Sequence, residues 1–452
     1  MTVFQAATST DLITAFTAAQ SGDRIELAPG NYGATALQGM DFPGGLTIAS
    51  QDPAARAVFT NQLSLTGCSG VTITGVDVIA ASLASAPNYI RMNVTGCGNI
   101  TLSDMTVAGH VPTMAEGVDP ATATGLNRTT SIIAGFGYDL GINLRNVTGL
   151  NLTDVEITGV RIALPTLDVA QATFKRLHVH HVREAVDLSD VSDIVIEDCE
   201  FSEVIGWKIP GAPDGSGDHA DMIQYWGTQS QIGVHRITIR NNWFRNSPGN
   251  WSQSTFGHMR AATVGVTATE IEISGNFYEN AHSNAISIAD VTGLIIRDNL
   301  LVPNDGAIAA PYFPTINLLR CADALVENNR LCPCYAWSAN AIAARVASNA
   351  AANIVETGNV VLSMAPGPLY WQDARDAALA LGTPITLPAP PVIVPPVPPV
   401  VTPPPVVVPP VVTPPVPPVV VPAPVPDLIG DMMRAIGDAL ITAADARKTP
   451  MP

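Results

Sequence analysis

A short pattern of apolar and polar residues recurs nine times between residues 71 and 331. Each copy has the form apolar-x-apolar-x-x-apolar-x-apolar, as in VTITGVDV from Val71 and LIIRDNLL from Leu294. The other copies begin at Ile100, Leu150, Ala172, Ile194, Ile237, Ile271 and Ala324. The shortest interval between starts is 22 residues, and the longer intervals fit one coil with an insertion, or two coils. Self-similarity with this period predicts a solenoid in which each copy belongs to one coil.

The sixth position of the pattern changes character along the chain. It is apolar in the first five copies and asparagine in the last four, at Asn242, Asn276, Asn299 and Asn329. A single asparagine at a strand end is normally a turn former, but four in one register indicate an internal ladder. In stacked, in-register strands each amide can bond to the one above and the one below.

A second strand with a period of two precedes many of these copies. Its segments are Ile142-Asn143-Leu144, Val186-Asp187-Leu188, Ile223-Gln224-Tyr225, Ile286-Ser287-Ile288 and Ile316-Asn317-Leu318. We expect the aliphatic residues to face inward and the polar ones outward. Two or three short strands per coil of about 22 residues, with no helical period between them, predict an all-β solenoid. A sandwich would need hairpin turns of the Asn-Gly kind, which the joints lack.

These repeats resemble the right-handed parallel β-helix proteins of the pectate-lyase-like superfamily, over residues 1–366. The segment DLITAFTAAQ (11–20) resembles the amphipathic helix that caps their first coil, and GDRIELAPGNYG (22–33) resembles their first strand and turn. The resemblance implies a single-stranded right-handed parallel β-helix with an N-terminal capping helix. It leaves the activity open, because the superfamily contains lyases, hydrolases, epimerases, adhesins and phage tailspikes.

Proline marks a change of architecture after the repeats. Residues 388–426 hold 19 of the 38 prolines and have no glycine and no charge, which predicts a stiff polyproline II rod. Residues 367–387 connect this rod to the β-helix. In 427–452, one helical face carries Leu428, Met432, Ile436, Leu440 and Ala443. We therefore expect a short amphipathic helix that anchors the chain to a partner or self-associates. The alternative is a disordered tail with a chance helical pattern.

Charge and cysteine content exclude several function classes. The formal charge is −17, whereas nucleic-acid binding needs clustered Lys and Arg, so no nucleic-acid partner is expected. Any uncharged apolar run of about 20 residues in this chain contains proline, so no membrane span is expected. The N-terminal segment lacks the features of a Sec signal peptide, which predicts synthesis and assembly in the cytoplasm. The six cysteines are expected to be reduced core thiols, and neither a metal nor a cofactor is expected.

The most specific candidate chemistry lies in residues 206–227, GWKIPGAPDGSGDHADMIQYWG. The stretch His-x-Asp-x-Ile-Gln within it resembles a motif of bacterial β-helix proteins that bind or act on polysaccharide. Aligning the coils by their second strands places Glu184, Asp221 and Asn284 in one column. His219 and His282 then form another column, Arg183 lies beside them, and His258 and Arg260 come from the coil between. The candidate catalytic residues are Asp221, His219, Glu184, Arg260 and His282.

Such a patch would suit either of two reactions on sugars. Two carboxylates, one with a raised pKa, would serve glycoside hydrolysis. A cation that polarises a uronate, with a histidine as base, would serve β-elimination. The candidate substrate-binding residues are Trp207, Lys208, Gln224, Tyr225, Trp226 and Trp251, because aromatic rings stack on sugar faces. The alternative is that the aspartates bond turn amides and the histidines are solvated surface residues.

Three functions fit these features. The first is a spike on the virion surface of a phage or gene transfer agent, which binds and could cleave host cell-surface polysaccharide. It would attach to a particle protein through 427–448, and a homotrimer would fit because many β-helix spikes are trimers. The resemblance departs in one respect, since tailspikes usually anchor by an N-terminal domain. The second is a secreted, extracellular polysaccharide lyase, hydrolase or epimerase, and the third is a purely structural or adhesive β-helix. The charge of −17 favours neutral or weakly acidic glycans.

Overall fold

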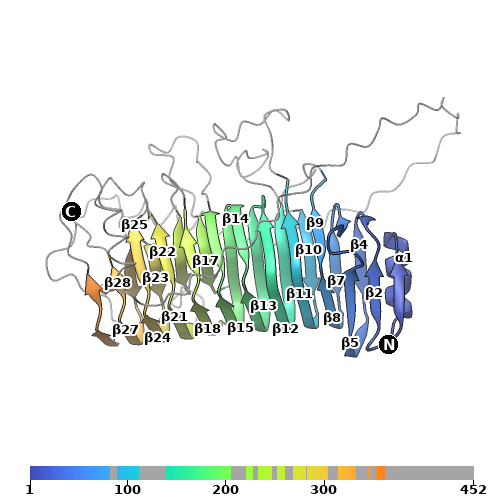
Figure 1. The fold of residues 1–452 in the computed structure, drawn as a ribbon. Helices are drawn as coiled ribbons and strands as arrows, with labels where there is room; N and C mark the ends of the chain where they lie inside the picture. Colours follow the sequence, from blue (N-terminus) through green and yellow to red (C-terminus); the bar gives the residue numbers. More distant parts are fainter. Residues whose placement is uncertain are drawn as a thin grey trace, which may run out of the picture. The chain divides into compact units, whose positions relative to one another are not determined.

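The computed structural model describes residues 1–81, 89–110, 139–204, 220–227, 233–246, 252–259, 268–280, 282, 284–303, 314–331, 344–346 and 352–361. Within these residues, 31 strands and one α-helix follow one another along the chain. The strand pairings are parallel, and each strand pairs with the equivalent strands of the neighbouring coils. The chain therefore winds as a parallel β-helix (Figure 1).

Each coil presents three faces, which we call the first, second and third face in chain order. The first face is formed by β4 (Thr35–Gln38), β7 (Leu63–Thr66), β10 (Ile90–Thr95), the starts of β12 (Leu140–Thr158), β13 (Ile162–Lys175) and β15 (Glu184–Glu197), β17 (Asp221–Trp226), β20 (Gln253–His258), β23 (Asn284–Ala289), β26 (Thr315–Leu319) and β29 (Ala344–Val346). The second face comprises β1 (Val3–Ala6), β2 (Arg24–Leu27), β5 (Asp41–Ser50), β8 (Ser69–Thr74), the start of β11 (Gly98–Ala108), later parts of β12, β13 and β15, β18 (Val234–Arg240), β21 (Ala268–Ser274), β24 (Val291–Arg297), β27 (Ala322–Glu327) and β30 (Ala352–Thr357). The third face comprises β3 (Gly30–Asn31), β6 (Ala57–Phe59), β9 (Val76–Ile79), the ends of β11 and β12, β14 (His178–Val182), β16 (Glu200–Val204), β19 (Trp243–Arg245), β22 (Phe277–Asn280), β25 (Leu300–Pro303), β28 (Arg330–Leu331) and β31 (Val360–Val361).

The recurring pattern occupies the second and third faces, and its spacing follows from the turn between them. Apolar residues at the first and third positions, such as Ile194 and Ile196, are fully buried. The fifth position has a left-handed backbone, with φ of 57° at Asp198 and 55° at Asn328. A left-handed residue turns the chain by one corner and is tolerated best by Gly, Asn and Asp. That residue interrupts the alternation, which is why two non-core positions separate the two apolar pairs.

The expected asparagine ladder is present in the core at this corner. Asn242 Nδ2 donates to Asn276 Oδ1 at 3.0 Å, and Asn276 Nδ2 donates to Asn299 Oδ1 at 3.0 Å. The ladder continues from Asn299 to Asn329 at 2.9 Å and on to Asn359 at 3.0 Å. Each amide nitrogen also donates to a backbone carbonyl, as Asn276 does to Ile239 at 2.9 Å. The four central amides are 1% exposed or less, so this corner of the core is polar yet fully bonded.

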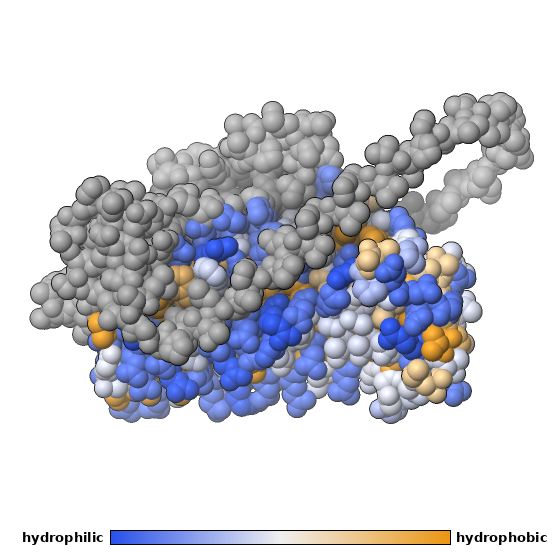
Figure 2. Space-filling view, in the orientation of Figure 1, coloured by the Kyte–Doolittle hydropathy of each residue, from blue (hydrophilic) through white to orange (hydrophobic). Residues whose placement is uncertain are grey.

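A helix, α1 (Ser9–Ala18), lies at the N-terminal end of the stack, close to the range expected for one (Figure 1). The Thr8 hydroxyl caps it by accepting from the Asp11 N–H at 3.1 Å. The helix buries Leu12, Ala15 and Phe16, and the Phe16 ring meets the Phe42 ring with centroids 5.5 Å apart. Figure 2 shows that the viewed face of the described coils is mostly hydrophilic, with a hydrophobic patch at the N-terminal end.

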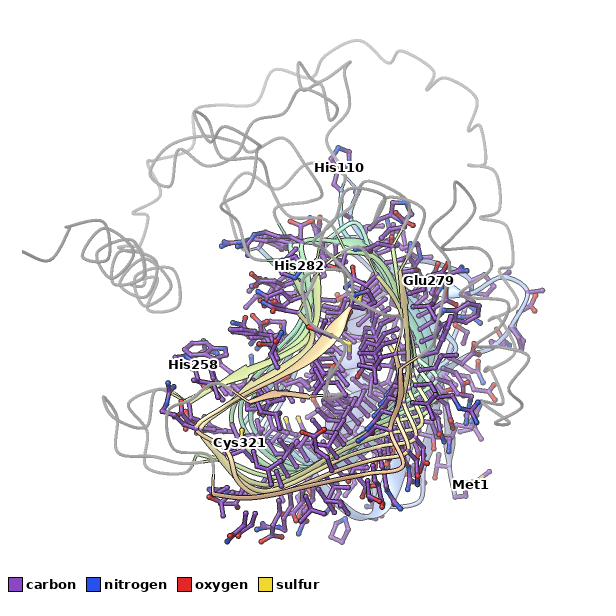
Figure 3. All side chains as sticks on the ribbon, turned by 90° about the vertical axis from the view of Figure 1, so that its left-hand side faces the viewer. Met1, His110, His258, Glu279, His282 and Cys321 are labelled. Atoms are coloured by element: carbon purple, nitrogen blue, oxygen red, sulfur yellow. The ribbon has the colours of Figure 1, made fainter. Side chains whose placement is uncertain are left out.

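The core is continuous and contains reduced thiols. The end-on view shows the side chain of Cys321 among the inward-pointing residues (Figure 3). Cys68, Cys97, Cys199 and Cys321 are buried and free, as expected. Cys332 and Cys334 lie outside the described residues, as do 367–387, the rod 388–426 and the segment 427–452. The one helix that the structure describes is too short to cross a membrane.

Candidate functional site

Strand register places Glu184, Asp221 and Asn284 in one column, in the order expected from the sequence. In β15 and β17, Val186 pairs with Ile223 and Asp187 with Gln224, so Glu184 stands opposite Asp221. Asp221 then pairs with Gln253 of β20. Asn284 Nδ2 donates to Gln253 Oε1 at 2.8 Å. The column lies at the start of the first face and changes from carboxylates to amides along the stack.

Three carboxyl groups gather at the acidic end of this column, and we call Glu184, Asp187 and Asp221 the acidic trio. Their exposed fractions are 3%, 5% and 1%. The Arg183 guanidinium donates to Glu184 Oε1 and is itself only 8% exposed. Three carboxylates buried close together would repel one another if all three were ionised. A proton held within the trio relieves part of that repulsion.

Asp187 is the member of the trio whose environment favours the proton most clearly. Burial raises the pKa of Asp187 well above its ordinary value, and the charges of Glu184 and Asp221 raise it further. A hydrogen bond with Glu184 adds to the raised pKa, while Arg183 opposes it. Glu184 Oε2 and Asp187 Oδ1 are buried and have no hydrogen-bond partner among the described residues. Asp187 therefore has the environment of a protonated acid, and a second carboxyl group lies beside it.

Aromatic and polar side chains line the outer surface of the first face beside the trio. Trp226 and Gln224 alternate outward on β17 and are partly exposed. Phe256 of β20 pairs in register with Gln224, and His258 with Trp226. Sugar rings stack on such aromatic faces while amides bond their hydroxyls. We call Gln224, Trp226 and Phe256 the aromatic strip.

Tyr225, expected to bind substrate, is instead a core residue. It alternates inward between Gln224 and Trp226 and is 0% exposed. Its ring lies against Gly257 of the next coil, where an added Cβ would come within 1.8 Å of the Tyr225 ring. Tyr225 thus fills space left by a glycine and does not reach a ligand on the outer surface.

The described histidines of the expected patch are separated along and across the first face. Figure 3 places His282 and His258 apart on this face. The His282 ring accepts from the Asn284 N–H at 3.0 Å, two residues before the amide end of the column. His258 lies beside Asp290, with Nε2 and Oδ2 3.7 Å apart, at the far end of β20. His219, Arg260, Trp207, Lys208 and Trp251 lie outside the described residues.

Two features of the structure are not predicted from the sequence. The first is the burial of Asp187, since the alternation of β15 predicts only that this polar residue faces outward. The second is the set of Glu156, His178 and His180 on the third face, whose ligand atoms all lie within 4.8 Å of one another, although no metal site was expected. Repeat alignment contains a signal for it, because Glu156 and His178 occupy the seventh position of consecutive copies.

The buried state of Asp187 predicts that Asp187→Asn stabilises the protein at neutral pH. A raised pKa in the folded state means that the native protein binds a proton that the unfolded chain releases above about pH 3.9. Stability is then lost as pH rises from that value through the raised pKa of Asp187. The amide imitates the protonated acid, so the variant should gain in Tm over wild type as pH rises and should match it in acid. Thermal unfolding across pH measures this difference.

Asp193→Asn is the matched control for this measurement. The Arg236 guanidinium lowers the pKa of Asp193, and its Nε lies 2.6 Å from Asp193 Oδ1 on the exposed second face. A lowered pKa reverses the effect of pH on stability, because the ionised Asp193 stabilises the folded state. Asp193→Asn should therefore lose a little stability above the ordinary aspartate pKa and none in strong acid. Equal pH dependence of the two variants would contradict the proton assigned to the trio.

Similar folds occur among solved structures. The Dettilon tailspike protein is 14% identical over 78% of this chain and 62% of that chain, with a TM-score of 0.49. Pectate lyase Pel9A is 10% identical over 80% and 82% of the two chains, with a TM-score of 0.39. An alginate lyase from Paenibacillus sp. is 12% identical over 79% and 95%, with a TM-score of 0.36. The matched tailspike and lyases are parallel β-helix proteins. No protein-family model matches the chain, and no curated protein sequence matches it.

Proposed function

We propose that this chain binds a polysaccharide along the aromatic strip and hydrolyses it with the acidic trio. The observation that supports this most is the burial of Glu184, Asp187 and Asp221 together, at the start of a face that carries outward aromatic residues. Paired carboxyl groups in different protonation states are the working parts of glycoside hydrolases. A purely structural coil has no need for three buried acids that lie together.

In this proposal the protonated Asp187 is the general acid. It gives its proton to the glycosidic oxygen as the bond from that oxygen to the anomeric carbon breaks. An ionised carboxylate of the trio either activates the water that attacks this carbon or attacks the carbon itself, forming a glycosyl ester that water then hydrolyses. Hydrolysis is favoured over β-elimination because three carboxyl groups lie together here and the Arg183 guanidinium already bonds to one of them, Glu184. Arg260, a candidate catalytic residue, and Lys208, a candidate substrate-binding residue, lie outside the described residues.

We further propose that the β-helix is displayed on a particle, as the spike of a phage or gene transfer agent would be. In this proposal α1 caps the first coil, the polyproline rod 388–426 holds the β-helix away from the particle, and 427–452 docks on a particle protein or forms a homotrimer. The composition of 388–426 supports this, since a stiff spacer is useful when something is held at each end. A secreted hydrolase with the same trio is the alternative, and it gives the rod no role.

A cleavage and binding assay on the full chain tests the proposed chemistry. The chain is incubated with purified bacterial capsular polysaccharides and O-antigens, neutral and weakly acidic, and with alginate and pectate. Hydrolysis should produce new reducing ends without the ultraviolet absorbance of an unsaturated uronate, and at least one neutral or weakly acidic glycan should respond. Absorbance from an unsaturated product would replace hydrolysis by β-elimination, and binding without new ends would leave only the adhesive part of the proposal.

Trp226→Ala tests the aromatic strip on whichever glycan binds. The variant should weaken binding about tenfold, equivalent to about 1.4 kcal/mol of lost stacking. Trp243→Ala is the matched control, because Trp243 lies on the third face with its ring under the Arg245 guanidinium, 4.6 Å from it. That variant should keep full affinity. Equal losses in both variants would show that the aromatic strip is not the binding surface.

A further inference from the structure

A cluster of imidazole and carboxylate groups lies on the third face, on a different face from the acidic trio. His178 and His180 alternate outward on β14, and Val179 between them is fully buried. Glu156 of β12 pairs in register with His178, and Thr158 pairs with His180. On the other side of β14, Glu200 of β16 pairs with His178. The His-x-His segment is therefore flanked by a glutamate on each neighbouring coil.

The ligand atoms of this cluster are already close to one another. His180 Nε2 lies 3.0 Å from Glu156 Oε1, and the two imidazole centroids are 4.2 Å apart. The candidate ligand atoms of Glu156, His178 and His180 all lie within 4.8 Å. Zn–N and Zn–O bonds of about 2.0–2.2 Å place the ligands of a tetrahedral ion about 3.3–3.5 Å apart. The separations in the cluster, 3.0 Å for His180 and Glu156 and at most 4.8 Å for any pair, lie on either side of that spacing.

The surroundings orient these groups in the way that metal ligands are oriented. His180 Nδ1 lies 2.7 Å from His181 Nδ1 and 3.3 Å from the Thr158 hydroxyl, so the second ring nitrogen has partners while Nε2 faces Glu156. Hydrogen bonds to the non-ligating nitrogen fix ring orientation and tautomer in metal sites. The side chains are partly sheltered, with exposed fractions of 12% for His178 and 17% for His180.

A fourth group stands next to the cluster. Glu200 Oε1 lies 4.0 Å from His178 Nε2, and its side chain is 7% exposed. The Arg245 guanidinium holds the same oxygen, with Nη2 at 2.9 Å. Glu200 could therefore complete a tetrahedral set or support His178 from outside it. Three protein ligands would leave one position for water or another ligand.

We infer that Glu156, His178 and His180 form a binding site for one Zn²⁺ ion, with Glu200 and His181 in support. Two imidazoles with one or two carboxylates suit a borderline ion such as Zn²⁺, whereas Ca²⁺ and Mg²⁺ prefer oxygen ligands alone. The ion cross-links β12 and β14, which are neighbouring strands of the third face. Since β14 ends at Val182 and leads into Arg183 and Glu184, the bound ion also braces the corner that carries the acidic trio.

Zinc titration of the full chain, purified without a histidine tag and stripped with a chelator, tests this site. Wild type should bind one equivalent of Zn²⁺ whose affinity falls at least about tenfold in His178→Ala, His180→Ala and Glu156→Gln. Glu156→Gln is the variant least able to disturb folding, because Glu156 is 35% exposed. His235→Ala is the matched control on the second face, where its Nδ1 meets the Thr269 hydroxyl at 2.8 Å, and it should bind as wild type does.

Two further measurements separate this site from other zinc ligands. Co²⁺ bound in place of Zn²⁺ should give the visible absorption of a four-coordinate site in wild type and lose it in the double variant His178→Ala/His180→Ala. Zn²⁺ should also raise the Tm of wild type and leave that of the double variant unchanged. Three results would overturn the inference. They are wild-type zinc affinity in the double variant, loss of zinc binding in Cys332→Ser/Cys334→Ser instead, and no zinc binding to the wild type.

Discussion

Asn276→Ala should lower the free energy of unfolding by about 3–5 kcal/mol, one of the largest losses that a single side chain of this protein can cause. The Asn276 amide donates to Asn299 Oδ1 and to the Ile239 carbonyl, and its oxygen accepts from the backbone and side chain of Asn242. Removing it leaves several fully buried polar groups without partners, each of which costs about 1–3 kcal/mol. The small cavity left by the amide adds to this. Urea unfolding of the variant and of wild type measures the difference.

Asn93→Ala is the matched control for the ladder. Asn93 Oδ1 accepts from Asn143 Nδ2 at 2.7 Å, and Asn93 is partly exposed whereas Asn143 is 3% exposed. Asn93→Ala therefore leaves a single buried amide nitrogen without this partner, and the loss should be smaller, about 1–2 kcal/mol. Asn276→Asp adds a second check. This variant should be much less stable than wild type at neutral pH, where the buried carboxyl group must ionise or hold its proton at a cost. Its stability should recover as pH falls and the carboxyl group takes up a proton. Similar small losses in Asn276→Ala and Asn93→Ala would mean that the ladder is not a stabilising element.

The ladder could be predicted from the sequence because it depends on one number, the position within a repeat. Parallel in-register coils place equal positions on top of one another, so four asparagines at the sixth position must be neighbours. The same logic gave the column of Glu184, Asp221 and Asn284, which the register confirms. The same reasoning predicts that the residues at the seventh position are neighbours, as Glu156, His178 and Glu200 are on three consecutive coils.

The errors concern burial, which repeat position does not give by itself. Asp187 alternates outward between Val186 and Leu188, and an outward carboxylate is normally solvated. Asp187 is nevertheless 5% exposed, and strand periodicity carries no information about what covers an outward position. Tyr225 differs from Asp187, since the alternation that places Gln224 outside also places Tyr225 inside. The preference of sugar sites for aromatic residues says less about its position than this alternation does.

Glu184→Gln, Asp187→Asn and Asp221→Asn should each lower the rate of glycan hydrolysis by about 10²–10⁴-fold, while glycan binding changes by only a few-fold. General acid–base catalysis by one positioned group contributes about this much. Each amide keeps the shape of the acid it replaces but can no longer exchange a proton. Reducing-end release under saturating glycan measures the rate, and equilibrium binding of the same glycan measures the affinity.

Glu272→Gln is the matched carboxylate control for these variants. Glu272 lies on the second face, where its Oε1 is 2.8 Å from Arg297 Nη2, away from the acidic trio. This variant should hydrolyse glycan as fast as wild type. If Asp187→Asn also hydrolysed at the wild-type rate, the trio would be structural, and its three buried acids would need another explanation.

The pH dependence of hydrolysis identifies which member of the trio gives the proton. Burial and the neighbouring charges of Glu184 and Asp221 raise the pKa of Asp187, so Asp187 remains protonated at pH values where an ordinary aspartate is ionised. A general acid must carry its proton, and the rate should therefore fall as pH rises through this raised pKa. Because the three acids interact, the measured pKa values belong to the trio as a unit. Removing one negative neighbour by Glu184→Gln or Asp221→Asn should shift the alkaline limb to lower pH, since less charge then opposes the ionisation of Asp187. Residual activity in these two variants with an unshifted limb would assign the proton to a group outside the trio.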